Sequence, residues 1–317
     1  MTMNSKLLIL LTSFGMYAFS QVDSTGIKLL SERQFAEAQS LFESAIKKNS
    51  KDADAHYYLA LSFMGQRNLD DAEDEIDEAI DLNEHVSKYH IARGNILGLQ
   101  TMNANPVSQA FLAPKVKNAY LRGSELDPNN IEARQALYNY YVMAPGIMGG
   151  SEEKAFEQAN AIVKLNPFRG YIMLANFHMR VNKDTIEAEK QIKKAISAEP
   201  ERGDGYKQLG YHYLNRKRFQ DAYIQMQKFI DAEPKNPDSY DSYGDVFKAE
   251  KKYDQAIEKY HRALSVDKTF SASIYSLAEC YELKGQRQKA KETFQWFIAV
   301  DPHNRRADTA QKKIKEL

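Results

Sequence analysis

A pattern of small and apolar residues recurs along this chain every 34 residues. The alanines that mark the interval are Ala38 and Ala72, followed further along by Ala188, Ala222, Ala256 and Ala290. Apolar residues follow each alanine at four and seven places, as Ile192 and Ala195 follow Ala188. A fixed period of this length is typical of an array of small stacked units, each too small to bury its own apolar face. We therefore expect one repetitive all-α fold.

Residues 203–236 show what one unit contains. Tyr206, Leu209 and Tyr213 recur at helical spacing, and after a polar turn at 216–218 the second helical pattern runs from Phe219. Pro234 ends the unit because proline cannot continue a helix. The unit is predicted to be a helix-turn-helix hairpin.

This pattern resembles the tetratricopeptide repeat, with bulky or aromatic residues at positions 4, 11 and 24 and small residues at 8, 20 and 27. Residues 53–86, 237–270 and 271–304 resemble it as well. The resemblance implies an α-solenoid of about eight helix-turn-helix repeats with a C-terminal capping helix. The repeats are expected at 21–52, 53–86, 87–130, 131–167, 168–202, 203–236, 237–270 and 271–304. Residues 305–317 are expected to form the cap, with Ala310, Ile314 and Leu317 facing inward.

The first twenty residues are typical of a signal peptide. Lys6 precedes an apolar run over residues 7–19, and Ala18-Phe19-Ser20 provides a cleavage site before Gln21. A buried first helix is the alternative. Because no cysteine follows the run, a lipoprotein is not expected. The sequence predicts an exported protein, periplasmic or secreted, with no membrane insertion after signal removal.

Composition argues against several functions. Lys+Arg and Asp+Glu both number 43, so no net charge attracts the chain to nucleic acid. The single cysteine, Cys280, is expected to be a buried structural thiol. No phosphate-binding glycine loop, paired metal-ligand spacing or nucleophile elbow occurs in the sequence. We expect no catalytic residue, no cofactor and no metal.

The period is interrupted in the middle of the chain. Position 8 of the first helix and position 20 of the second are 12 residues apart in regular units, as in Gly210 to Ala222. They are 22 residues apart in the third unit, from Gly94 to Val116, and 17 apart in the fourth, from Tyr138 to Ala155. The fifth has one residue more than expected. Insertions at equivalent points of adjacent units should be neighbours and often mark a binding face. The inserted-loop candidates are Asn105, Pro106, Pro145, Gly146, Ile147, Gly149 and Gly150.

Residues 140–155 also resemble a subgroup of exported bacterial tetratricopeptide proteins, through an aromatic pair and an Ala-Pro-Gly-Ile-x-Gly-Gly turn. Ser151 is expected to cap the helix that follows this turn. An anion bound at that helix start is the alternative, although Glu152 and Glu153 would repel it.

The family resemblance implies that positions 2, 5, 9 and 12 of each first helix line a concave groove. The groove candidates are Tyr57, Leu61, Asn95, Gln135, Asn139, Asn176, Tyr211, Asp241, Asp245, Tyr275 and Glu279. Asn95, Asn139 and Asn176 would form a ladder of amides suited to a peptide backbone. The carboxylates would give the C-terminal groove an acidic lining that favours a basic partner segment, or would only be solvated.

The sequence thus predicts a non-catalytic exported scaffold that binds a protein or peptide on its concave face and central inserted loops. A structural assembly factor of a cell-envelope complex, docking through convex or terminal surfaces, is the main alternative. A regulatory subunit that binds a small molecule is a third hypothesis.

Overall fold

The computed structural model describes residues 24–317 of the chain. The expected signal peptide, residues 1–20, lies outside the described residues. Every regular element between Ser24 and Leu317 is a helix, and no strand occurs in that range. The expected all-α solenoid of helical repeats is confirmed.

The described residues divide into two units. Unit 1 comprises the chain up to Tyr140 together with Ala144–Gly150, and unit 2 comprises Tyr141–Met143 and Ser151–Leu317. The helices up to this division are α1 (Ser24–Ser31), α2 (Phe35–Lys48), α3 (Ala53–Gly65), α4 (Leu69–Leu82), α5 (Ser87–Asn103), α6 (Pro106–Leu126), α7 (Ile131–Met143) and the 3-10 turn η1 (Gly146–Met148). α7 runs from one unit into the other.

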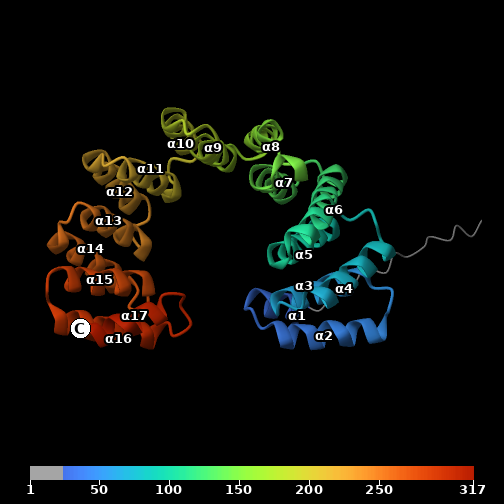
Figure 1. The fold of residues 1–317 in the computed structure, drawn as a ribbon, viewed down its shortest axis with the longest axis horizontal. Coiled ribbons are helices and arrows are strands. Elements are labelled where there is room, and N and C mark those ends of the chain that lie inside the picture. The colour runs from blue at the N-terminus through green and yellow to red at the C-terminus, as the bar shows by residue number, and fades with distance from the viewer. Residues whose placement is uncertain (1–23) are drawn as a thin grey trace, which may run out of the picture. The chain divides into compact units, whose positions relative to one another are not determined.

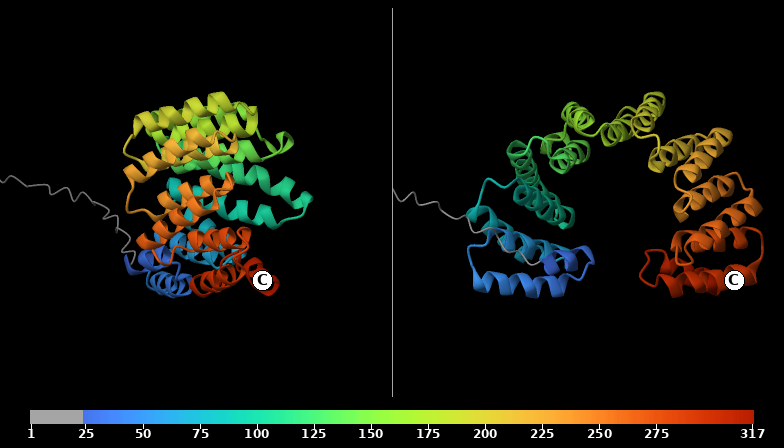
Figure 2. Two further views of the ribbon diagram at one scale, coloured as in Figure 1. Left: turned by 90° about the vertical axis from the view of Figure 1, so that its left-hand side faces the viewer. Right: turned by 180° about the vertical axis from the view of Figure 1, so that it is seen from behind.

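Unit 2 continues with hairpins of closely similar length. Its helices are α8 (Glu152–Leu165), α9 (Pro167–Phe177), the π-helix η2 (His178–Asn182), α10 (Thr185–Ala198), α11 (Gly203–Asn215), α12 (Phe219–Ala232), α13 (Pro237–Ala249), α14 (Tyr253–Val266), α15 (Ser271–Leu283), α16 (Arg287–Val300) and α17 (Ala307–Glu316). Figure 1 shows α13–α14 and α15–α16 as successive layers, and both views in Figure 2 show the same order for these orange and red hairpins. The contacts agree, because α14 packs against both α13 and α15.

Local sequence fixes where the helices start. The side chains of Asp52 and Asn236 accept hydrogen bonds from backbone amides of the first turns of α3 and α13. Pro237 occupies the first turn of α13, where its missing N–H costs nothing. The turns inside five hairpins share a left-handed second residue, and these residues are Arg33, Arg67, Lys217, Lys251 and Gly285.

The core of unit 2 lies between the paired helices. Tyr260, Phe294 and Phe297 are at most 1% exposed, and the small side chains of Ala256 and Ala278 next to them are fully buried. Burying one such aromatic ring contributes about 1.5–3 kcal/mol. The 34-residue period therefore places one small and one large residue at each helix crossing.

The three irregular repeats absorb their extra residues differently. In the third, both helices are longer, with 17 residues in α5 and 21 in α6 against 13 and 14 in a regular pair such as α11 and α12. In the fourth, α7 and α8 keep 13 and 14 residues, and the connecting turn is longer. In the fifth, the extra residue is accommodated where α9 continues into the five-residue π-helix η2, a single wider turn of the kind found inside α-helices.

The C-terminal cap follows its sequence pattern. In α17, Ala310 is fully buried, and Ile314 and Leu317 pack half-buried against the core beneath α15 and α16. Cys280 in α15 is fully buried as well, and burial raises the pKa of its thiol to about 12. Both sequence predictions are confirmed.

Candidate functional site

The first helices of unit 2 bring most of their groove candidates together. α11 contacts α13, and α13 contacts α15, so residues on the same face of these helices become neighbours. A cavity of about 310 Å³ lies there, lined by Asp241, Asp245, Lys248, Ala272, Tyr275, Ser276, Glu279 and Arg306. Four of the groove candidates, Asp241, Asp245, Tyr275 and Glu279, are among these residues, and a fifth, Tyr211, bonds one of them.

Asp245 is held from three directions. The Tyr260 hydroxyl donates to its Oδ1 at 2.8 Å, and the Tyr211 hydroxyl donates to its Oδ2 at 3.0 Å. The Lys248 ammonium lies 3.6 Å from Oδ1. Burial, reinforced by the negative charge of Asp245, raises the pKa of Tyr211 and of Tyr260 far above the ordinary value, so both remain donors.

Lys248 links the two helices that form the cavity. Its Nζ donates to Glu279 Oε2 at 3.1 Å and to Ser276 Oγ at 3.2 Å, both on α15. Burial works against its positive charge, but Asp245 and Glu279 outweigh burial and raise the pKa of Lys248. The lysine therefore stays charged and neutralises part of the acidic lining.

Asp241 is the least compensated carboxylate of the cavity. It is 6% exposed, and the Ser273 hydroxyl donates to its Oδ1 at 2.6 Å. Among residues 24–317, its other oxygen, Oδ2, has no hydrogen-bond donor and no cation within ion-pair distance. Burial, followed by the negative charges of Asp245 and Asp238, raises the pKa of Asp241 to about 7.

The acidic lining expected from sequence is thus largely paired within the protein. Lys207 bonds Asp238, Lys248 bonds Glu279, and Lys313 Nζ lies 2.5 Å from Glu282 Oε2. The sequence also places Lys207 among the groove positions, but it did not predict Lys248, Lys313 or any of these three pairings. In each pair the partners are 31 residues apart, which is the offset between facing positions of adjacent repeats. A search for opposite charges at that offset could have found them.

In unit 1, the groove candidate Tyr57 belongs to an aromatic cluster. Its ring centroid is 4.8 Å from that of Tyr58 and 5.3 Å from that of Tyr89. Lys88 Nζ lies 4.8 Å above the Tyr57 ring and 2.6 Å from Asp54 Oδ1. The positive charge of Lys88 is therefore already paired with a carboxylate of the protein. Leu61 packs half-buried beside the aromatic cluster.

The expected asparagine ladder is divided between the units. Asn95 and Asn139 are exposed residues of unit 1, whereas Asn176 is a half-buried residue of unit 2. Gln135 is half-buried in α7. Asn95 Oδ1 accepts a hydrogen bond from the Tyr120 hydroxyl at 2.9 Å, so this oxygen already has a protein donor.

The prediction that Asn105 and Pro106 lie in an inserted loop is wrong. Asn105 is the N-cap of α6, its side chain accepting hydrogen bonds from the amides of Val107 and Ser108, and Pro106 is the first residue of the helix. Both residue types favour a helix start. The first insertion therefore forms a longer helical hairpin.

The lengthened part of α6 presents an apolar stripe to solvent. Val107, Ala110, Phe111 and Pro114 are all exposed and recur at helical spacing, with Phe111 73% and Val107 68% exposed. Ala113 and Val116 on the other side of the helix are buried. This part of the hairpin is thus apolar on both faces, which is unusual for a helix at a protein surface.

The second insertion is a genuine turn. Within it, the Tyr140 hydroxyl donates to the carbonyl oxygen of Met148 at 2.5 Å, and Ile147 is 96% exposed. Pro145 precedes η1, Gly146 begins it, and Gly149 ends it with φ of +91°. Gly150 N donates to the Pro145 carbonyl at 3.1 Å. The expected cap is present, because Ser151 Oγ accepts from Lys154 N.

The helix that contains the first insertion contacts the turn formed by the second. α6 contacts η1, and Lys117 of α6 lies against Gly149. On α6, the contact residue Lys117 lies after the inserted residues and not within them.

Further features of the described residues bear on function. No group of three or more histidine, cysteine, aspartate or glutamate side chains between residues 24 and 317 could hold a metal ion. Over the same residues, no helix is long and apolar enough to cross a membrane.

The fold and these surfaces define a solenoid of paired helices. Family models described as tetratricopeptide repeat match residues 25–85 and 248–314. These matches identify tetratricopeptide repeats in both units. No curated protein matches the chain.

The chain is also similar to chains in several solved structures. Yeast Tom70 is 17% identical, with 90% of this chain and 58% of that chain covered and a TM-score of 0.67. The APC/C hetero-tetramer Cut9-Hcn1 is 15% identical over 92% of this chain and 54% of that chain, with a TM-score of 0.47. MamA is 22% identical over 48% of this chain and 90% of that chain, with a TM-score of 0.41. The chain thus spans somewhat more than half the length of the Cut9-Hcn1 and Tom70 chains, and the similarity to Tom70 shows the fold.

Proposed function

We propose that this protein is a non-catalytic scaffold that binds a protein or peptide partner on the groove face of its first helices and at its two insertions. The observation that carries the proposal is the cavity in unit 2, where groove candidates from successive repeats meet. Tetratricopeptide repeats are generally non-catalytic interaction modules, which supports the same function.

The α6 stripe supports a role for the first insertion. A solvent-exposed run of apolar side chains costs solubility, so its presence favours an interaction surface. The stripe lies on residues that a regular repeat lacks. Binding through several repeats and this hairpin together would add affinity without any one very strong contact.

Capture of partners from an extract of the native cells tests this function. The purified protein is compared with a groove variant, Tyr275→Ala with Asn139→Ala, and a hairpin variant, Val107→Ser with Phe111→Ser. Both variants should retain less of the partner than the wild type does. The Glu258→Gln variant, altered on the exposed surface of α14, should retain all of it. Full capture by both the groove and the hairpin variants would contradict the proposal.

Export is part of the proposed function, and it has a direct test. Expression in the native cells should yield a protein that begins at Gln21 and leaves the cytoplasm. Intact mass spectrometry of fractionated cells measures both. A chain that retains residues 1–20 in the cytoplasm would contradict export.

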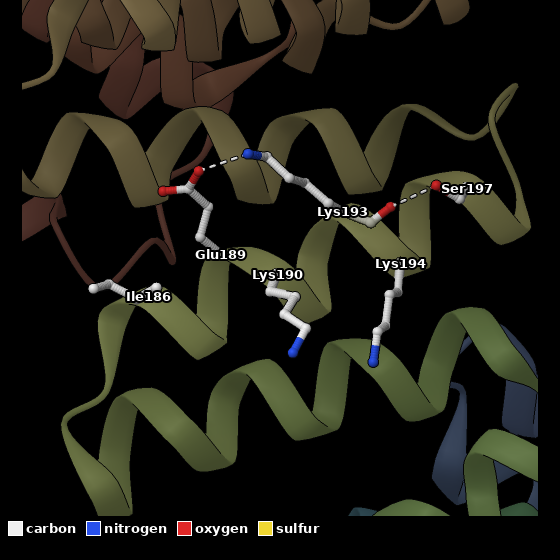
Figure 3. Close-up of a pocket in the computed structure, with 6 residues that line it drawn as sticks. All are labelled: Ile186, Glu189, Lys190, Lys193, Lys194 and Ser197. Atoms are coloured by element: carbon white, nitrogen blue, oxygen red, sulfur yellow. Dashed lines mark hydrogen bonds and ion pairs between the residues drawn. The ribbon is translucent and has the colours of Figure 1, made fainter.

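A second candidate function is an assembly factor that docks through the outer, second helices. A hollow of about 420 Å³ along α10 favours it, lined by Ile186, Glu189, Lys190, Lys193, Lys194 and Ser197. In Figure 3, Lys190 and Lys194 extend to one side of α10, whereas Glu189 and Lys193 extend to the other and bond each other at 2.7 Å. Ile186 is 75% exposed at the end of this hollow.

One substitution distinguishes the two functions. Because Ile186 is exposed, Ile186→Ser should leave the free energy of unfolding unchanged within about 0.5 kcal/mol. Loss of partner capture by this variant, with full capture by the groove variant, would favour the assembly factor. The reverse result would favour groove binding.

A further inference from the structure

The cavity of unit 2 contains one carboxylate oxygen that the protein itself leaves without a partner. Asp245 is bonded by Tyr211, Tyr260 and Lys248, and Glu279 is bonded by Lys248. Asp241 is more than nine-tenths buried, yet within residues 24–317 only its Oδ1 is hydrogen-bonded. Oδ2 is not one of the fully buried side-chain atoms without a partner in residues 24–317, so it is accessible from the cavity that Asp241 lines. A carboxylate with so little solvent around it is costly without a counter-ion, and its accessible oxygen favours a cation in this cavity.

The charges around the cavity determine which ligand fits. The charged and titratable groups that face Asp241 come from its own helix, from α11, α14 and α15 and from the residue before α17, and they are Asp238, Asp245, Lys248, Lys207, Tyr211, Tyr260, Tyr275, Glu279 and Arg306. Lys207 is paired with Asp238, and Lys248 is shared by Asp245 and Glu279. The lining therefore keeps an excess of negative charge at Asp241.

Arg306 and Tyr275 show how the mouth of the cavity accommodates a cation. The Arg306 guanidinium lies 4.8 Å from the centroid of the Tyr275 ring, and Arg306 is exposed. No carboxylate among the described residues forms an ion pair with it. An aromatic face beside a carboxylate is a favourable environment for a guanidinium or an ammonium group.

We propose that this cavity receives a single cationic side chain, a lysine or an arginine of the bound protein, with Asp241 Oδ2 as its counter-ion. This inference rests on the proposed function, since it names what the groove recognises in its partner. The volume of about 310 Å³ is at the lower end of small-molecule sites, which hold about 300–1,000 Å³. It therefore suits one side chain and excludes a folded element.

Binding of the cation is coupled to a proton. Without ligand, burial and the neighbouring carboxylates Asp245 and Asp238 hold the pKa of Asp241 near 7. A cation at Oδ2 favours the ionised carboxylate and lowers this pKa. Below pH 7, binding consequently releases a proton, and affinity for the cation rises as the pH increases from 6 to 8.

Small probes test the site on the purified protein, independently of any natural partner. N-acetyl-arginine methylamide and N-acetyl-lysine methylamide carry the cation, and N-acetyl-citrulline methylamide is the uncharged control. NMR titration at pH 8 gives the dissociation constants, and the ¹³Cγ shift of Asp241 reports its ionisation. We expect both cationic probes to bind at least about tenfold more tightly than the citrulline probe does.

Three variants locate the binding. Asp241→Asn keeps the shape and an oxygen for Ser273, and should weaken the cationic probes about tenfold or more. Glu258→Gln removes the same charge from the exposed surface of α14 and should change affinity less than about twofold. Arg306→Gln removes a competing cation and should strengthen the cationic probes. Weaker binding of the cationic probes by Arg306→Gln would overturn the proposal, because removing a neighbouring positive charge cannot weaken a cation that is bound at Asp241.

The outcomes separate this inference from the proposed function. Capture of a partner protein without preference for cationic probes overturns the inference and leaves the scaffold function standing. Tight binding of cationic probes without capture of any partner supports the cavity assignment and contradicts the scaffold function. If Asp241→Asn does not fold, the wild-type ¹³Cγ titration decides, since an Asp241 pKa that stays constant at saturating arginine probe overturns the proposal.

Discussion

In the turn after α7, the carbonyl oxygen of Ala144 approaches Gly150 so closely that a Cβ at position 150 would lie 1.8 Å from it. Because the contact is with backbone, no rotamer change could relieve it. We predict that Gly150→Ala lowers the free energy of unfolding by about 1–3 kcal/mol. Urea unfolding followed by circular dichroism measures the change.

Gly146 provides the matched control in the same turn. Nothing lies within 4 Å of a Cβ built there, and its backbone is not left-handed. Gly146→Ala should therefore be neutral within about 0.5 kcal/mol. Equal losses from both substitutions would mean that the turn does not have this conformation.

The repeated left-handed turn residue leads to a second prediction. Lys251 has φ of +63° where the next repeat has Gly285 at +71°. In this conformation the Cβ of a lysine lies too close to the following carbonyl oxygen, whereas glycine has no Cβ. Lys251→Gly should therefore raise the free energy of unfolding by about 0.5–1 kcal/mol. Gly285→Lys should lower it by about 1 kcal/mol.

Lys251→Ala separates this backbone effect from the loss of a charge. Alanine has the same steric conflict as lysine, so the variant should gain no stability. A gain equal to that of Lys251→Gly would assign the effect to the charge of Lys251. Thermal and urea unfolding of the three variants decide between these explanations.

The π-helix η2 leads to a third prediction. Ala175 and Ala188 are one residue further apart than the matching pair Gly210 and Ala222, and η2 accommodates the extra residue. Deleting the exposed Arg180 restores the regular spacing. Because the neighbouring helices already pack with regular contacts, the free energy of unfolding should fall by less than about 1 kcal/mol or rise.

A deletion in a regular repeat is the control for Arg180. Removing Asn215, exposed in the last turn of α11, leaves that hairpin one residue short. The second helix must then shift against its neighbours, and we expect a loss of about 2–4 kcal/mol. If deleting Arg180 lowers the free energy of unfolding by as much as deleting Asn215 does, the packing of the fifth repeat depends on the extra residue.

The sequence predicts the regular repeats well because their signal is periodic and local. Ala256 and Tyr260 recur at intervals that only one packing accommodates, and both are fully buried. The insertions have no such period. The sequence gives the lengths of the insertions. Whether ten extra residues lengthen the helices or the turn depends on local caps such as Asn105 and on tertiary contacts.

The candidate site was predicted only in part, for an electrostatic reason. Family positions placed Asp241 and Tyr275 on one face, and both line the cavity. They could not reveal that Lys248 neutralises Glu279, because that pairing joins different repeats. The sequence therefore predicted an acidic surface. In the structure, Asp241 is the one carboxylate lining this cavity that has no cationic partner within residues 24–317.

Asp241 also leads to a prediction about stability and pH. Burial and the neighbouring Asp245 raise its pKa in the folded protein to about 7, well above that of an aspartate in an unfolded chain. Between these two values the folded state binds more protons than the unfolded state does. Stability from this group is therefore present at pH 4 and is lost as the pH rises to 7, by about 1–4 kcal/mol.

Other groups titrate in the same range, so the comparison must isolate Asp241. Burial lowers the pKa of His212 and of His261, and these residues make stability rise with pH. Their contribution is common to the wild type and to Asp241→Asn, and it cancels in the difference. Urea unfolding at pH 4.5, 6 and 8 should show the variant gaining stability relative to the wild type as the pH rises. A constant difference across this range would mean that Asp241 ionises at its ordinary pKa and that its environment in the cavity is polar.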